Sequence, residues 1–180
     1  MMLSNKELND LISSGSLKIT PSIDKSSIGV SSIDLHLGEV ITEMKEFDGI
    51  TIRPGKSYPN GLFLTGNVNK SLIIKPNELK LALTKEHITM PLEYAGFVEG
   101  RSTYARFGIS IHVTAPLIEP GFVGNITLEI TNNGPNKVEL VPNEDAVCQL
   151  ILFTLSSPVS KDLSKLVNYK DQKSGAPRTY

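Results

Sequence analysis

Short hydrophobic segments separated by proline and glycine turns fill most of this 180-residue sequence, and this pattern constrains the fold more than any other feature. Turn pairs such as Pro54-Gly55, Pro120-Gly121 and Asn133-Gly134 mark the boundaries between segments. Many short strands with such turns favour a β-sandwich, a jelly roll or a distorted barrel over alternating βαβ units. The expected strands cover residues 17–20, 32–37, 71–76, 79–85, 95–100, 109–115, 125–131 and 146–155.

The N-terminus carries the one segment with a clear helical pattern. Ser4 and Glu7 have the spacing of a capping box, in which each side chain bonds the other residue's main-chain N–H. Apolar residues follow at helical intervals as far as Ile12, and Gly15 is a suitable stop. We therefore expect a short helix over about residues 4–14.

The chain is long enough for a single domain with a hydrophobic core. Residues 1–159 are expected to form the β-barrel domain together with the N-terminal helix. Residues 160–180 are polar, with lysines at positions 161, 165, 170 and 173. Such a segment cannot bury much surface alone, so we interpret it as a flexible C-terminal part of the same domain, either disordered or a lid that orders over a ligand.

Composition excludes several classes of protein. The net charge of −1 gives no strong field toward nucleic acid or membranes, so neither partner is expected. No run approaches the roughly 18 apolar residues of a membrane span, and residues 1–15 lack the apolar stretch of a signal peptide. The single cysteine, Cys148, lies in an apolar run and is interpreted as a reduced core thiol of a cytoplasmic protein.

Several types of catalytic site are also absent from the sequence. His36, His87 and His112 are far apart, and with one cysteine they offer no zinc-binding cluster. The H-x-E and P-C-x-x-C pair of zinc nucleobase deaminases does not occur. Nor does the chain contain a Walker A motif, a G-x-G-x-x-G turn or a G-x-S-x-G elbow.

Two of the four arginines fall in one short segment, GRSTYARFG at 100–108. Arginine grips phosphate or carboxylate through a planar pair of donors. The neighbouring hydroxyl residues and flanking glycines allow hydroxyls and main-chain N–H groups to converge on an anion. From composition alone, a turn with two surface ion pairs accounts for the segment equally well.

Two acidic segments follow. In NITLEIT at 125–131 the apolar side chains share one face, while Thr127, Glu129 and Thr131 share the other. Glu129 is thus a carboxylate on a polar strand face, which in most proteins is simply solvated. Glu119 lies in IEPGFVG at 118–124, which also fits an ordinary β-turn.

In combination, these segments resemble the dCTP deaminase family within the trimeric dUTPase-like superfamily. The similarity is carried by SSIDLHLG at 31–38, LKLALT at 79–84, GFVEGRSTYAR at 96–106, HVTA at 112–115, IEPGF at 118–122 and GNITLE at 124–129. Their order and spacing are far more specific than any one of them. The resemblance implies a mainly β, distorted barrel or jelly roll of the dUTPase-like type, assembled as a homotrimer with sites between subunits.

The resemblance also implies a reaction: the exocyclic amine of dCTP is hydrolysed to give dUTP and ammonia, without zinc, while Mg²⁺ accompanies the triphosphate. Glu129 would be the general base that activates water. Arg106 would stabilise developing charge, and Ser102 would orient the water or the leaving ammonia. The implied substrate-binding residues are Arg101, Ser102, Thr103, Tyr104, Ala105, Arg106, Ala115, Glu119, Thr127, Leu128, Glu129, Gln149, Asn168, Tyr169, Lys170 and Gln172.

Departures from the family pattern keep alternatives open. Glu119 stands where the family usually has Asp, which disfavours dUTP hydrolysis, and Ala105 favours deamination alone. Asn168 stands where a phosphate-binding lysine is common. The main alternative is a bifunctional enzyme that also cleaves dUTP to dUMP and pyrophosphate. A dUTPase and a non-catalytic nucleotide-binding barrel are the other two.

Overall fold

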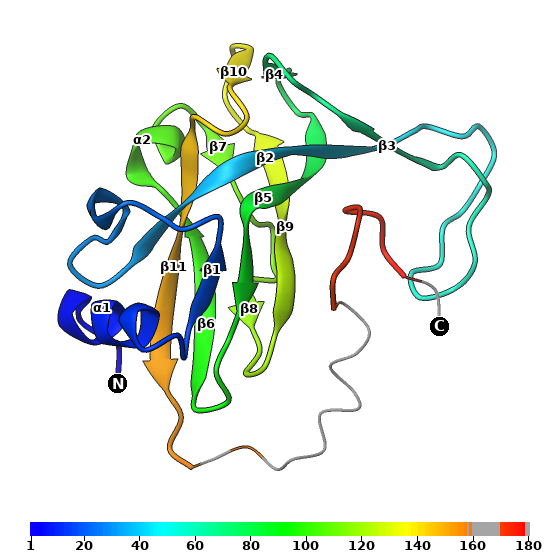
Figure 1. Cartoon of the computed structure of the whole chain (residues 1–180). Coiled ribbons are helices and arrows are strands. Elements are labelled where there is room, and N and C mark those ends of the chain that lie inside the picture. The colour runs from blue at the N-terminus through cyan, green and yellow to red at the C-terminus, as the bar shows by residue number, and fades with distance from the viewer. Residues whose placement is uncertain (158, 160–169, 179–180) are drawn as a thin grey trace.

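A single strongly curled sheet forms the body of the protein in a computed structural model that describes residues 1–157, 159 and 170–178 (Figure 1). The strand order is β7-β9-β5-β2-β11-β6-β8, with β1 paired to β5 and β3 paired to β2; β10 and β4 form a separate pair. The elements are α1 (Asn5–Ser13), β1 (Lys18–Thr20), the 3-10 turn η1 (Lys25–Ser27), β2 (Ile33–Met44), β3 (Phe63–Asn67), β4 (Leu72–Ile74), β5 (Leu79–Thr89), β6 (Tyr94–Gly100), α2 (Ser102–Ala105), β7 (Ile109–Ser110), β8 (Leu117–Ile118), β9 (Val123–Asn132), β10 (Val138–Leu140) and β11 (Ala146–Thr154).

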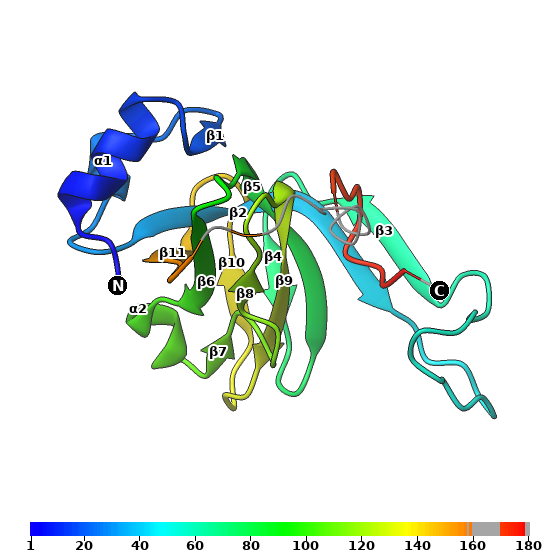
Figure 2. The same ribbon diagram turned by 90° about the horizontal axis from the view of Figure 1, so that it is seen from below.

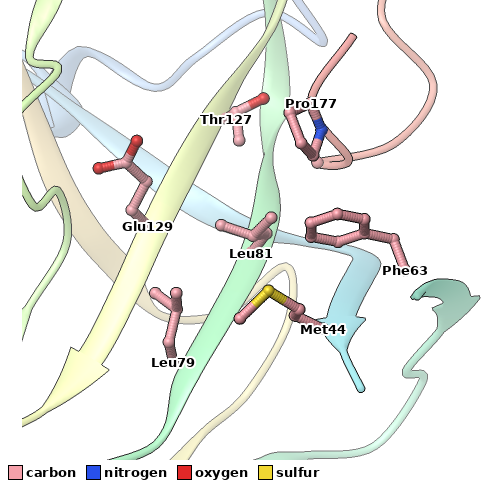
Figure 3. A pocket seen from close by; sticks show the side chains of 8 residues that line it. Met44, Phe63, Leu79, Leu81, Thr127, Glu129 and Pro177 are labelled. Carbon is pink, nitrogen blue, oxygen red and sulfur yellow. The ribbon is translucent and has the colours of Figure 1, made fainter. Parts of the chain in front are cut away.

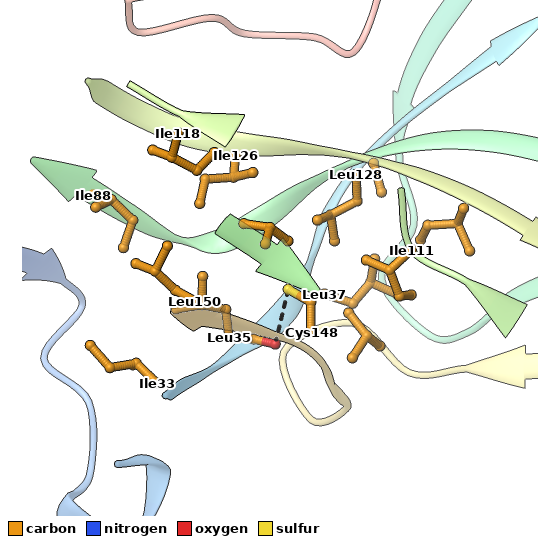
Figure 4. Packing of buried hydrophobic residues seen from close by; sticks show 14 of the residues in the cluster. Ile33, Leu35, Leu37, Ile88, Ile111, Ile118, Ile126, Leu128, Cys148 and Leu150 are labelled. Carbon is orange, nitrogen blue, oxygen red and sulfur yellow. Dashed lines mark hydrogen bonds between the residues drawn. The ribbon is translucent and has the colours of Figure 1, made fainter. Parts of the chain in front are cut away.

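The inner face of this curled sheet holds the core (Figure 4). Burial in β9 alternates strictly along the strand, so Ile126, Leu128 and Ile130 point inward. Cys148 on β11 is fully buried among them, as predicted for a core thiol. Each such aliphatic side chain contributes roughly 1.5–3 kcal/mol by leaving water. The polar face of β9 is therefore fixed outward, with Thr127 and Glu129 on it.

Irregular pairing along β5 gives the sheet its curl. The registers shift between Leu83 and His87 against β9, and again where β5 meets β2. Such bulges bend a strand and increase its twist. The fully buried Thr84 stabilises the irregularity, because its hydroxyl donates to the Glu86 carbonyl at 2.8 Å and accepts the Ile126 N–H at 2.9 Å.

The predicted N-terminal helix is confirmed, and it begins one residue later than expected. Both bonds of the capping box form: the Ser4 main-chain N–H donates to Glu7 Oε2 at 2.9 Å, and the Ser4 hydroxyl accepts the main-chain N–H of Glu7. The Ser4 hydroxyl also donates to Glu7 Oε2 at 2.9 Å. The predicted mainly β fold is confirmed as well. Most predicted strands are present, but β2 and β5 extend well past residues 37 and 85.

One strand prediction is wrong in part, and several short elements were missed. Residues 109–115 form a strand only over Ile109–Ser110, because the next residues bond to β9 irregularly instead of continuing the ladder. The sequence pattern did not indicate β3, β8, β10 or the one-turn helix α2. These elements are short or exposed and lack a repeating apolar pattern.

Strands β2 and β3 project beyond the barrel as a two-stranded arm, joined by the long loop 45–62 (Figures 1 and 2). The described C-terminal segment, residues 170–178, lies between this arm and the barrel. It therefore lies beside the outer face of the sheet, where Thr127 and Glu129 point.

Candidate active site

A cavity of about 610 Å³ lies between the outer face of β9, the loop before it and the C-terminal segment. Five of the predicted substrate-binding residues line it together: Ala115, Glu119, Thr127, Glu129 and Gln172. Four of them lie within residues 115–129, and Gln172 follows 43 residues later in the chain. The structure thus brings together the part of the predicted site that contains the two carboxylates, Glu119 and Glu129.

A smaller cavity of about 240 Å³ adjoins the first and shares Thr127, Glu129, Gly175 and Pro177 with it (Figure 3). Its other lining side chains are apolar and come from the arm and from β5: Met44, Phe63, Leu79 and Leu81. Glu129 is therefore a carboxylate bordered by apolar surface on one side and by polar groups on the other. Such surroundings suit a group that exchanges protons with a bound substrate.

Two hydrogen bonds hold Glu129 in place. Its main-chain N–H donates to the Ile111 carbonyl at 2.8 Å, and its Oε2 accepts the N–H of Val113 at 2.8 Å. Because the carboxylate takes the place of a strand partner here, the expected strand stops at Ser110. Within the described residues, Oε1 accepts no hydrogen bond, so this oxygen remains available to a water or ligand.

Arg101 anchors the start of α2. Its Nη1 donates to the Ala146 carbonyl at 3.0 Å, and its Nη2 lies 3.2 Å from Asp34 Oδ2. Asp34 Oδ1 in turn accepts from Gln149 Nε2 at 3.3 Å. Gln149, predicted as substrate-binding, therefore belongs to the cluster around Arg101 and not to the Glu129 cavity.

Tyr104 provides the second anchor of α2. Its hydroxyl donates to Asp145 Oδ1 at 3.0 Å. Burial and the neighbouring Asp145 carboxylate raise the pKa of Tyr104 to about 12, so the phenol stays protonated at neutral pH. With α2 tied at both ends, Ser102, Thr103, Ala105 and Arg106 are left exposed on its surface.

The predicted site is thus divided into two groups within one chain. Neither cavity that contains Glu129 is lined by any residue of 101–106. Figures 1 and 2 both place α2 on the opposite side of β9 from the C-terminal segment. The arrangement of Arg106 and Ser102 beside Glu129 does not occur within a single chain.

The remaining predicted residues have different placements. The Leu128 side chain is fully buried in the core, which leaves only its main chain for any contact with substrate. Lys170 is exposed near the start of the described C-terminal segment. Asn168 and Tyr169 lie outside the described residues.

Sequence reasoning missed several groups at the site. Phe122 and Asn125 line the larger cavity, and the N–H of Val113 holds Glu129. Asn125 shares the polar face of β9 with Glu129, so the alternating pattern could have indicated it. The Val113 contact had no signal in the sequence, because any residue except proline supplies a main-chain N–H.

No group of three or more His, Cys, Asp or Glu side chains in the described residues is arranged to hold a metal ion. None of the described helices has the length and apolar character needed to cross a membrane.

Comparisons with known proteins point to one family. Residues 2–155 match the model of a family described as dCTP deaminase-like. A dUMP-forming dCTP deaminase of Methanosphaera stadtmanae is 39% identical over an alignment of 168 residues that covers 89% of this chain and 82% of the relative. A dCTP deaminase of Thermomicrobium roseum is 36% identical over 162 residues, 88% of this chain and 82% of the relative.

A solved structure shares the fold. The crystal structure of 2'-deoxycytidine 5'-triphosphate deaminase from Agrobacterium tumefaciens superposes with a TM-score of 0.67 at 15% identity, over 93% of this chain and 52% of that longer chain. The predicted dUTPase-like type of fold is confirmed. By the match of its sequence from residue 2 to residue 155, the chain belongs to the dCTP deaminase-like family.

Proposed function

We propose that this protein hydrolyses dCTP to dUTP and ammonia without zinc, with Glu129 as the general base. A chain of this family is an enzyme that acts on dCTP, and relatives named dCTP deaminase at 36–39% identity support the substrate. The observation that carries the proposal is Glu129 itself. Its carboxylate is held by the Val113 N–H at 2.8 Å in a cavity that also contains Ala115, Thr127 and Gln172.

The chemistry follows from a carboxylate in that position. Oε1 of Glu129 takes a proton from water as the water oxygen bonds to C4 of cytosine. The protonated carboxyl group passes this proton to ring nitrogen N3, which has taken the electrons of the C4=N3 double bond. The hydroxyl proton left on C4 is then carried to the amine, the C4–N bond breaks, and ammonia leaves as the carbonyl of uracil forms. The Ala115 carbonyl and the Thr127 main chain would recognise the edge of the base. Glu119 would lie near the deoxyribose.

The second half of the site would come from another copy of the chain. Arg106 and Ser102 lie on the exposed surface of α2, away from the Glu129 cavity of their own chain. Phe107 beside α2 is 68% exposed and Val113 beside Glu129 is 54% exposed. Both side chains would be covered if these two surfaces met between subunits. A homotrimer would place α2 of one chain at the cavity of the next.

Magnesium would arrive with the triphosphate. Mg²⁺ commonly binds substrate phosphates with one or two carboxylates and several waters, where it neutralises phosphate charge. Both oxygens of Asp34 are engaged, with Arg101 and with Gln149, so the phosphates and water would supply most of the ligands of the ion. Arg101 is already paired with Asp34, so Ser102 and Thr103 with the N–H groups of α2 would make the first phosphate contacts. Lys170 would add positive charge.

A bifunctional enzyme is the second candidate, because the relatives in Methanosphaera stadtmanae and Methanobrevibacter smithii are named dUMP-forming. Such an enzyme would release dUMP and pyrophosphate as well as ammonia. Glu119 in place of the family's usual Asp disfavours this second reaction. We further place the enzyme in the cytoplasm, free of nucleic acid, since its net charge is −1 and its cysteine is buried and free.

One assay tests the proposal. The purified protein is incubated with dCTP and Mg²⁺, and dCTP, dUTP and dUMP are separated over time while ammonia and pyrophosphate are measured. Equal amounts of dUTP and ammonia without pyrophosphate support the deaminase. Equal amounts of dUMP, ammonia and pyrophosphate identify the bifunctional enzyme. Binding of dCTP with no ammonia release contradicts both and leaves a nucleotide-binding module.

A further inference from the structure

The C-terminal segment, residues 170–178, is attached to its own chain at three separate points. At its start, the Asp171 N–H donates to the Val123 carbonyl at 2.9 Å, and Asp171 Oδ1 lies 2.9 Å from His87 Nε2. At its centre, the Gly175 N–H donates to Thr42 Oγ1 at 3.1 Å. Beyond that, the carbonyl of Pro177 accepts from the hydroxyl of Tyr58 at 2.9 Å.

Thr42 is buried by this attachment. Its neighbour Ile41 belongs to the core, and adjacent residues of a strand point to opposite faces, so Thr42 points outward. A threonine on the outer face of a sheet is normally accessible to solvent. Thr42 is nevertheless 0% exposed, with Gly175 on one side and the Thr65 hydroxyl at 2.8 Å on the other.

The absence of a side chain at position 175 permits this close approach. A Cβ at Gly175 would lie 2.6 Å from the Cβ of Leu81, a distance that real Cβ atoms essentially never show. The conflict is with an atom rigidly fixed to the strand, so a larger residue would lift the segment. Position 175 therefore requires glycine for steric reasons, because the segment packs directly against the outer face of β5.

The place of contact is next to the catalytic carboxylate. Thr65, Thr42, Leu81 and Glu129 are direct partners across four neighbouring strands, β3, β2, β5 and β9. Neighbouring strands lie about 5 Å apart, so the main chain of Glu129 is one strand away from Leu81. Gly175 rests on the middle of this row. Gln172, three residues earlier, lines the Glu129 cavity, and its amide donates to the Ala176 carbonyl at 2.9 Å.

We infer that Thr42, Leu81 and His87 form a seat on the outer face of the sheet that holds residues 170–178 over the Glu129 cavity before any nucleotide binds. Thr42 and His87 are then positioning residues that place Gln172 at the cavity. The seat exists in the chain alone, while its effect on dCTP turnover rests on the proposed function. The two parts are therefore tested by separate measurements.

The first measurement is hydrogen exchange by mass spectrometry on the protein without nucleotide. Peptides that cover 170–178 are expected to exchange slowly in the wild type and at least tenfold faster in Gly175→Ala. Gly66→Ala is the matched control, because a Cβ at Gly66 in β3 meets nothing within 4 Å. Exchange at unprotected rates in the wild type, or unchanged protection in Gly175→Ala, would overturn the seat.

A second pair of variants tests the hydroxyl of Thr42 without adding bulk. Thr42→Val removes the bonds to both Gly175 and Thr65, while Thr65→Val removes only the bond between the two hydroxyls. Faster exchange of 170–178 in Thr42→Val and not in Thr65→Val, at similar melting temperatures, supports the seat. Equal exchange in both variants contradicts it.

Steady-state kinetics with dCTP test whether the seat positions Gln172. If the seat places this residue, Gly175→Ala and Thr42→Val raise the KM for dCTP about five- to twentyfold, whereas Gly66→Ala and Thr65→Val stay within twofold. The conservative variant His87→Asn, which keeps a hydrogen-bond donor for Asp171, should retain most of the wild-type KM. Loss of protection with unchanged KM and kcat would leave the seat intact and refute the positioning role.

Discussion

Replacing Glu129 by glutamine tests its proposed role as a base separately from its role in the fold. The amide oxygen of glutamine can accept the Val113 N–H that Oε2 now accepts at 2.8 Å. The loop that follows β7 should therefore stay in place, at a cost of about 1 kcal/mol for exchanging a charged acceptor for a neutral one. The amide NH2 group then occupies the position of Oε1, where it cannot accept a proton from water.

The expected loss is in kcat. Removal of a general base lowers the rate roughly 10²- to 10⁴-fold, which corresponds to about 3–5 kcal/mol of transition-state stabilisation. The dissociation constant for dCTP should change by less than about threefold, because the lining of the cavity is preserved. The assay is ammonia release at saturating dCTP, together with calorimetric binding of dCTP to the slow variant.

Glu119→Gln is the matched control, since it is the same change at a second carboxylate of the same cavity. It should affect KM more than kcat and keep turnover within about tenfold of wild type. If Glu129→Gln turns over dCTP within a few-fold of wild type, or if both variants lose kcat equally, Glu129 is not the base.

Three further predictions concern the metal, the anchoring of α2 and acid stability. Zinc chelators should leave dCTP turnover unchanged once Mg²⁺ is restored, and stoichiometric zinc in the active protein by elemental analysis would contradict this. Tyr104→Phe, which removes the bond to Asp145, should lower the free energy of unfolding by about 1 kcal/mol and raise the KM for dCTP, as measured by urea titration and kinetics. Hydrogen bonds from Lys45 and Lys80 lower the pKa of Glu43 from 4.5 to about 2. The ionised Glu43 side chain therefore stabilises the fold above pH 4.5, and this stabilisation is lost as the pH falls through 2. Because the side chain is 38% exposed, solvent screening limits its contribution to the free energy of unfolding to about 1 kcal/mol. Glu43→Gln should accordingly be less stable than wild type at pH 7 and equally stable near pH 2 in chemical unfolding.

The strand that carries the candidate base was predictable because its pattern is local. Alternation of apolar and polar residues over 125–131 places Glu129 outward whatever lies around it. The capping box of the N-terminal helix is local in the same way. In both cases the information lies within a few residues, so the sequence alone carries it.

The role of Arg101 was not predictable, because its partners are distant in the chain. The sequence indicated an anion-binding segment at 100–108, yet the Arg101 guanidinium bonds Asp34 and the Ala146 carbonyl. The C-terminal segment is a similar case: its polar composition indicated a flexible lid, and the close contact between Gly175 and Leu81 depends on the shape of a distant strand. Long-range contacts of this kind are set by the assembled sheet.

The rigidity of both halves of the site bears on how it becomes complete. Glu129 lies on a strand paired on both sides, with β5 and β7, and α2 is fixed by Arg101 and Tyr104. Neither element can swing toward the other without breaking several buried bonds, so closure within one chain is costly. In the proposed oligomer, association of chains would bring an α2 to a Glu129 cavity at no such cost. Sedimentation should then give an oligomer mass near three times 19.6 kDa. Specific activity should fall when the protein is diluted below the dissociation constant of this oligomer. Mixing the inactive variants Glu129→Gln and Arg106→Ala should restore part of the activity, because some mixed sites receive both intact residues. A monomer with full activity, or mixtures that stay inactive despite exchanging subunits, would refute the shared site.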